Sequence, residues 1–346
     1  MKLKILILVI LLICGSFFIK GQNRQIVSLD GIWRFTVDST NQGMKENWQN
    51  GIPSQCSHEV KVPHTWNIES GTEDYAGLGW YQKNLTLPDN WKNKNIRLKF
   101  NAVYHDATVY INGKKAGENL NAGFTPFVID ITQYVNFNST NTIVVKVNNE
   151  YSEKMFPYKK SFDWVNDGGI IRPVSIEITG NPSIRYVHIT PKLDLQDSIG
   201  DAMISIILWE KNIKKATFRF VFKEKKSGKV IQSITSKLSS IQGVFSNSFN
   251  LGKIKPWHFD FPDLYVLETS IITQDGISDN EISAFGFRKL EIKGDSKPNG
   301  LEIPGHGDAL REDIEKYPTW EDQLKWHTEY FKVDEVIEKL KKQGVL

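Results

Sequence analysis

The chain has 346 residues, enough for two or three domains that each bury a core of their own. Its formal net charge is only +3, and Lys2, Lys4 and Lys20 account for that excess. The remaining basic residues, 43 minus these three, match the 40 acidic residues in number. The composition therefore excludes the strongly basic surface expected of a nucleic-acid-binding protein.

Residues 1–21 have the pattern of a secretory signal peptide. A basic start is followed by an apolar run from Ile5 to Cys14. The run is shorter than the ~20 apolar residues that a membrane span needs. We expect cleavage near Gly21 and a secreted or periplasmic protein. The alternative is a lipid anchor on Cys14, and only in that case do we expect the chain to associate with a membrane. This alternative is disfavoured because Ile13 occupies the position at which a lipoprotein cleavage site has a small residue.

Residues 22–181 are predicted to form a first β-domain. Asn112-Gly113 favours a type I′ turn that joins two strands as a hairpin. The stretch from Arg172 to Thr179 predicts a further strand, with its apolar residues on one face. Short strands separated by turn signals indicate a sandwich or a jelly roll. Four other segments alternate apolar and polar residues with the period of a strand: Trp80–Leu87, Ile96–Phe100, Thr108–Ile111 and Ile143–Val147.

Residues 182–293 are predicted to form a second β-domain, which begins at the turn-rich Gly180-Asn181-Pro182. Ser227-Gly228 predicts another hairpin. If the leader is removed, Cys56 is the one cysteine left, so we expect an immunoglobulin-like sandwich without its disulfide. The predicted strands of this domain are Ile184–Ile189, Ile204–Leu208, Phe218–Phe222, Val230–Ile234 and Tyr265–Ile272.

Residues 294–346 differ in character from the two β-domains. Asp295 to Gly300 is linker-like, and Thr319 and Asp334 are suited to cap two helices. Apolar residues from Val333 to Leu340 fall at helical spacing. The predicted fold class is therefore all-β, with two sandwiches followed by a short helical C-terminal tail.

Eight short segments that occur in a fixed order along the chain support a more specific assignment. The most informative is Phe162–Pro173, with the pattern Asp-x-x-Asn-x-Gly-Gly-Ile-x-Arg. The others are Ser28–Phe35, Val62–Asn67, Gly79–Lys83, Val109–Lys114, Gly123–Thr132, Pro256–Tyr265 and Phe285–Arg288. Over roughly residues 26–292 these segments resemble landmarks of glycoside hydrolase family 2, the β-galactosidase and β-glucuronidase family.

The resemblance implies a jelly-roll sugar-binding domain followed by an immunoglobulin-like domain. In the family, a (β/α)8 barrel comes next and carries both catalytic glutamates of a retaining glycosidase. Such a barrel takes ~250 residues, and 54 residues follow residue 292. We therefore expect no catalytic residue in this chain.

The resemblance also implies a role for the loop from Phe162 to Gly169. In family members the aspartate that matches Asp163 reaches the barrel's active site and contacts a sugar hydroxyl or a sodium ion. Trp164 is suited to stack on a sugar ring, and Asn166 completes the predicted substrate-binding set. The alternative is that Asp163 accepts backbone N–H groups of its own turn. Phe162 stands where the glucuronidase pattern has histidine, so a glucuronide substrate is not supported.

Other chemically interesting side chains are assigned structural roles. Glu69, Glu73 and Asp74 are expected to form a solvated acidic loop. Trp33 and Trp80 lie within strand patterns and are expected to pack in the core.

The histidines do not predict a metal centre. His64, His105 and His306 lack partners at metal-ligand spacing. We therefore expect neither a metal nor a cofactor.

The sequence thus predicts the non-catalytic N-terminal part of an exported family 2 β-glycosidase, inactive alone. Its expected partners are a β-glycoside carbohydrate and a barrel supplied by another chain. A free-standing carbohydrate-binding or partner-docking module is the alternative from a different functional class.

Overall fold

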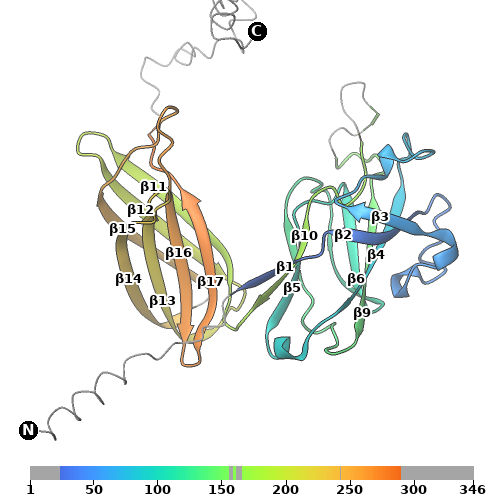
Figure 1. Cartoon of the computed structure of the whole chain (residues 1–346), viewed down its shortest axis with the longest axis horizontal. Coiled ribbons are helices and arrows are strands. Elements are labelled where there is room, and N and C mark those ends of the chain that lie inside the picture. The colour runs from blue at the N-terminus through green and yellow to red at the C-terminus, as the bar shows by residue number, and fades with distance from the viewer. Residues whose placement is uncertain (1–23, 156–158, 161–165, 242, 290–346) are drawn as a thin grey trace, which may run out of the picture. The chain divides into compact units, whose positions relative to one another are not determined.

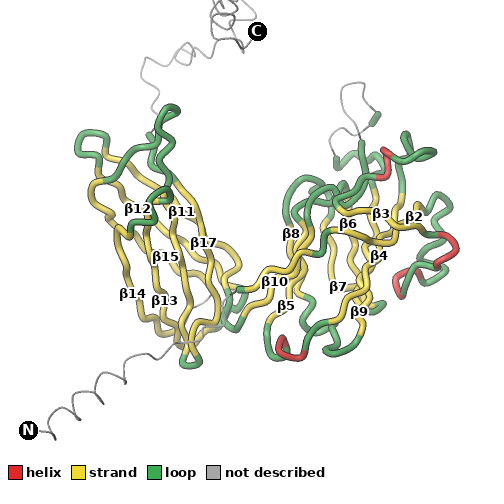
Figure 2. The backbone as a smooth tube through the Cα atoms, in the orientation of Figure 1, coloured by secondary structure: helices red, strands yellow, loops and turns green. Residues whose placement is uncertain are grey.

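The computed structural model describes residues 24–155, 159–160, 166–241 and 243–289. This part of the chain is all-β, as predicted, and contains two sandwiches joined by one short segment between Thr179 and Ile184 (Figure 1). Its helices are single turns at the margins of the first sandwich (Figure 2). These turns are η1 (Trp48–Asn50), η2 (Ser54–Cys56), η3 (Trp66–Ile68) and η4 (Asp89–Trp91). The predicted helical tail lies outside the described residues.

The first sandwich is a jelly roll made of two antiparallel sheets. The four-stranded sheet has the order β1-β10-β5-β8, and the six-stranded sheet has the order β3-β2-β4-β9-β6-β7. The strands are β1 (Gln25–Ser28), β2 (Gly31–Val37), β3 (His58–Val62), β4 (Leu78–Thr86), β5 (Asn95–Phe100), β6 (Asp106–Ile111), β7 (Lys114–Asn119), β8 (Phe127–Asp130), β9 (Thr140–Asn148) and β10 (Val174–Thr179).

The second sandwich is immunoglobulin-like. Its three-stranded sheet has the order β11-β12-β15, and its four-stranded sheet has the order β14-β13-β16-β17. The strands are β11 (Ile184–Asp194), β12 (Ile199–Leu208), β13 (Ile213–Glu224), β14 (Val230–Ile241), β15 (Val244–Lys253), β16 (Tyr265–Thr273) and β17 (Gly276–Phe285).

Each sandwich buries a core of its own, supplied by alternate residues of facing strands. Trp33 and Trp66 lie in the first core together with strand residues such as Ile176. The second core includes Phe220 and Phe287. Separate cores explain how the two sandwiches reach stability without a disulfide between them.

The predicted hairpins are confirmed. Asn112 and Gly113 have φ values of 50° and 80°, as a type I′ turn requires, and Ile111 pairs with Lys114 across it. Gly228 has a φ of 70° in the turn between β13 and β14. Strands with weak alternation were not predicted, namely β1, β3, β8, β15 and β17. In β15 the buried Phe245, Phe249 and Leu251 fall on one face, but the polar and exposed Asn247 interrupts their period of two.

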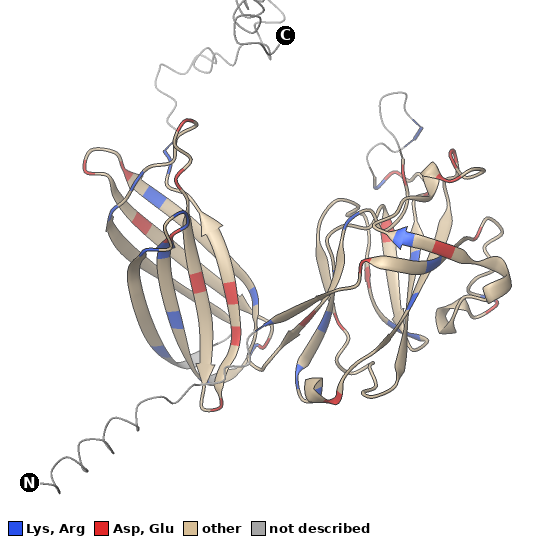
Figure 3. Cartoon of the chain, in the orientation of Figure 1, with Lys and Arg blue, Asp and Glu red and all other residues tan. Residues whose placement is uncertain are grey.

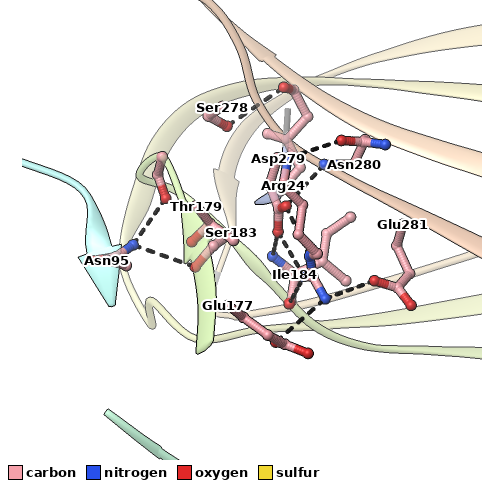
Figure 4. A network of polar contacts seen from close by, with 12 residues as sticks. Arg24, Asn95, Glu177, Thr179, Ser183, Ile184, Ser278, Asp279, Asn280 and Glu281 are labelled. Atoms are coloured by element: carbon pink, nitrogen blue, oxygen red, sulfur yellow. Dashed lines mark hydrogen bonds and ion pairs between the residues drawn. The ribbon is translucent and has the colours of Figure 1, made fainter. Parts of the chain in front are cut away.

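Strand β10 departs from simple alternation because both of its faces are covered. Val174, Ile176 and Ile178 face the jelly-roll core, as predicted. Glu177 and Thr179, on the other face, are also buried. They are covered at the junction of the two sandwiches, where Arg24 forms ion pairs with Glu177 of β10 and with Asp279 of β17 (Figure 4).

Candidate functional site

The candidate site is the loop cluster at the base of the Phe162–Gly169 loop, and paired asparagine amides fix that base. Asn149 Nδ2 donates to the carbonyl of Asn166 at 2.7 Å, and Asn166 Nδ2 donates back to the carbonyl of Asn149 at 2.6 Å. Asn149 Oδ1 accepts the N–H of Gly77 at 2.8 Å. Both amides are buried. They therefore hold together the two ends of the segment between residues 149 and 166, whatever its tip binds.

Gly168 and Gly169 are required by close packing more than by turn geometry. A Cβ at Gly168 would lie 2.0 Å from the indole of Trp66. At Gly169, φ is +146° and a Cβ would lie 2.3 Å from the carbonyl oxygen of His64. Tyr104 and Gly169 exchange two backbone hydrogen bonds of 2.9 Å each. The glycine pair thus allows the backbone at residues 168–169 to pack directly against Trp66 and the carbonyl of His64.

Asn67 connects this loop to its neighbour along the jelly-roll edge. Its Oδ1 accepts the N–H of Gly168 at 2.8 Å. Its Nδ2 donates to the carbonyls of Thr72, Glu73 and Tyr75 at 3.2, 3.1 and 3.0 Å. One side chain therefore organises both the 67–75 loop and the approach to Gly168.

A chain of polar contacts runs from the core to the surface beside these loops. His64 Nδ1 lies 2.8 Å from the hydroxyl of the buried Tyr81, and His64 Nε2 lies 3.1 Å from Glu69 Oε1. The same carboxylate lies 3.1 Å from Nε2 of the exposed His58. Burial lowers the pKa of His64, although the charge of Glu69 opposes that shift. Burial also raises the pKa of Tyr81 well above its usual value.

This arrangement corrects one expectation. Glu69 is not simply part of a solvated acidic loop, because it contacts two histidines from neighbouring segments. Asp74 behaves as predicted, being exposed and paired with the exposed Lys160. Sequence spacing gave no signal for the His58–Glu69 contact, because the contact joins the start of β3 to the residue that follows η3.

The predicted substrate-binding residues are placed only in part. Asp163 and Trp164 lie outside the described residues, so their roles stay predictions. Asn166 is buried, and its Nδ2 holds the loop base. Its Oδ1 is also buried and has no hydrogen-bond partner in the described structure.

The structure also places several of the other residues that were assigned roles from the sequence. Trp33 and Trp80 are buried in the first sandwich, as expected. His105 is buried and lies 2.8 Å from Asp106 Oδ1, and His306 lies outside the described residues. Within the described ranges, no group of three histidine, cysteine or acidic side chains is arranged to hold a metal ion. No helix among the same residues is long and apolar enough to cross a membrane.

Comparison with known proteins identifies the two sandwiches. Residues 26–179 match the family described as Glycosyl hydrolases family 2, sugar binding domain, and residues 183–288 match Glycosyl hydrolases family 2. A β-galactosidase of Thermoanaerobacter pseudethanolicus is 28% identical over 280 residues, which cover 79% of this chain and 37% of the relative. A β-glucuronidase of Formosa agariphila is 25% identical over a match that covers 84% of this chain and 32% of the relative.

Solved structures give the same result. A β-glucuronidase from Ruminococcus gnavus, in complex with D-glucuronic acid, superposes with a TM-score of 0.68 at 25% identity. The match covers 80% of this chain and 48% of that structure. The chain spans less than half the length of these relatives. Because both domain types match in the order found in the family, this chain belongs to glycosyl hydrolase family 2.

Proposed function

We propose that this chain is the non-catalytic N-terminal part of an exported family 2 β-glycosidase and that it does not cleave glycosides alone. The observation that carries the proposal is the pair of consecutive family matches over residues 26–179 and 183–288. The match covers only 37% of the β-galactosidase relative and 48% of the solved β-glucuronidase. We propose a β-glycoside as the chain's carbohydrate and a barrel domain supplied by another chain as its partner.

The chemistry of a retaining glycosidase supports this proposal. That reaction needs two carboxylates ~5–5.5 Å apart that both reach the scissile bond, one as nucleophile and one as acid/base. Glu177, Asp279 and Glu281 do gather in one place, but they surround the guanidinium of Arg24. Asp279 is fully buried there and also accepts the N–H of Ile184. These carboxylates are committed to the fold and are not available to a substrate.

An activity screen tests the proposal. The purified chain would be assayed on aryl β-galactoside, β-glucuronide and β-mannoside, alone and after co-expression with the catalytic part of a family 2 enzyme. We expect no turnover by the chain alone. Turnover that survives purification and is abolished by a substitution in this chain would contradict the proposal.

A second function, a free-standing carbohydrate-binding module, is favoured by one specific match. The first sandwich matches a family domain whose description is sugar binding. Under this reading the chain binds a saccharide with no catalytic partner. Binding of a saccharide to the chain by itself, with no gain on addition of a catalytic part, would favour the module over the enzyme fragment.

Export is the remaining part of the proposal, and it is supported by the basic and apolar composition of residues 1–21. Sequencing the N-terminus of protein recovered outside the cytoplasm tests it. A mature chain that starts near residue 22 is the expected result. A lipid-modified Cys14 would instead show that the protein is anchored.

A further inference from the structure

The tip of the second sandwich presents two phenylalanines to solvent. They lie on the segment from Pro256 to Leu264, which connects β15 to β16. Phe259 is 82% exposed and Phe261 is 70% exposed. Large apolar side chains exposed close together on a surface commonly mark a binding site. We call this segment, together with the adjacent Lys225 and Lys226, the aromatic tip.

The aromatic tip is held in one conformation by its own backbone. His258 and Phe261 exchange two backbone hydrogen bonds, of 3.0 and 3.1 Å, and Asp263 N donates to the carbonyl of Phe261 at 2.8 Å. Trp257 N donates to the carbonyl of Phe287 at 2.7 Å, which ties the segment to the sandwich. The ring of Trp257 packs edge-on against Phe259, with centroids 4.9 Å apart. Such a pre-organised display lowers the entropic cost of binding.

Polar groups of both signs surround the rings. A depression of about 610 Å³ lies beside Phe261, and its lining includes Asp260, Asp263, Lys225 and Lys226. This volume falls within the roughly 300–1,000 Å³ typical of small-ligand sites. The depression thus combines an apolar wall with carboxylate acceptors and ammonium donors.

This combination distinguishes between classes of ligand. An anionic lipid surface would suit the lysines, but insertion of Phe259 and Phe261 would carry Asp260 towards the acyl region at a cost in desolvation. A pyranose ring has an apolar C–H face for the phenyl rings. Its hydroxyls can donate to Asp260 and Asp263 and accept from Lys225 and Lys226. Charges of both signs are also mixed over the rest of the sandwich, without one dominant field (Figure 3).

We propose that the aromatic tip is a polysaccharide-binding site, separate from the loop cluster of the first sandwich, in which pyranose rings stack on Phe259 and Phe261. The inference goes beyond the proposed function, because it assigns carbohydrate binding to the second sandwich. It holds whether the chain acts as an enzyme fragment or as a free-standing module.

Native gel electrophoresis of the full chain tests the inference, with polygalacturonate or β-1,4-galactan cast into the gel. The two polymers distinguish an acidic from a neutral ligand. We expect at least one of them to retard the wild-type chain. The double variant Phe259→Ala/Phe261→Ala should weaken binding about tenfold or more, as for loss of a central aromatic contact. Ile282→Ala, which truncates a 62% exposed residue on β17, is the matched control and should bind normally.

Each other outcome overturns the inference. No retardation by either polymer means that the tip does not bind these polysaccharides, and it leaves the enzyme-fragment proposal intact. Equal retardation of wild type and double variant places carbohydrate binding elsewhere on the chain. Binding to lipid vesicles, or self-association, that depends on the two phenylalanines and occurs without polysaccharide binding would identify a different partner. If the double variant fails to fold, the single changes Asp260→Asn and Lys226→Gln must weaken retardation for the inference to stand.

Discussion

Arg24 should be the most sensitive position at the junction of the two sandwiches. Its Nη2 donates to Asp279 Oδ2 at 2.8 Å and to the carbonyl of Ile184 at 2.6 Å, and its Nη1 lies 2.7 Å from Glu281 Oε2. The side chains of Arg24 and Asp279 are 11% and 0% exposed. These charges pull the pKa of Arg24 above its usual value against the opposing effect of burial. Arg24→Ala would therefore leave the buried carboxylate of Asp279 without its charged partner.

The cost follows from what remains around Asp279. Breaking a buried ion pair from one side costs about 3–5 kcal/mol. Asp279 keeps the N–H groups of Ile184 and Asn280, at 2.7 and 2.9 Å, so we expect the lower end, about 3 kcal/mol. At roughly 2–4 °C per kcal/mol for a protein of this size, the melting temperature should fall by about 6–12 °C.

Lys99→Gln is the matched control within the same network. Lys99 Nζ lies 3.0 Å from Glu177 Oε1, but the lysine side chain is 35% exposed. Its loss should cost only ~0.2–1 kcal/mol, as for exposed ion pairs. Urea unfolding and calorimetry of both variants provide the measurement. A change below about 0.5 kcal/mol for Arg24→Ala, or equal losses in the two variants, would refute the reasoning.

Three further predictions concern the first sandwich. Gly168→Ala should destabilise the fold by about 1–3 kcal/mol through its clash with Trp66. Gly286→Ala is the comparison, since its backbone is not left-handed and the nearest atom to its Cβ would be Leu264 Cδ2 at 3.2 Å; urea midpoints that fall equally would contradict the clash argument. The pKa of His64 is lowered in the fold, so the unfolded chain takes up a proton first as the pH falls, and the stability that depends on the neutral ring is lost below about pH 6.5. The difference between the urea midpoints at pH 7.5 and pH 5.0 should therefore be smaller in His64→Gln than in wild type. An unchanged pH dependence in the variant would contradict this prediction. Asp163→Asn should leave stability within roughly ±0.5 kcal/mol but weaken a sugar contact by about 1.5–3 kcal/mol; a lower melting temperature at unchanged affinity would show that Asp163 caps its own turn.

Local patterns were sufficient for much of the fold. Alternation at Ile143–Val147 and turn chemistry at Asn112-Gly113 depend on neighbours in sequence, so the strand β9 and the hairpin could be predicted. The ordered motifs likewise indicate the family and both domain types. They also single out the Gly168-Gly169 pair, although the reasons lie in the tertiary structure: Trp66 approaches Gly168 closely, and the carbonyl of His64 approaches Gly169.

Pairings across long sequence distances were decided only by the tertiary structure. Asn149 and Asn166 are 17 residues apart, and Arg24 and Asp279 are 255 apart. Neither pair produces a periodic pattern in the sequence, because each contact depends on strand register and on the packing of separate segments. The same holds for the tip of the second sandwich. A phenylalanine pair in the sequence suggests a core, and only the path of the backbone turns Phe259 and Phe261 towards solvent.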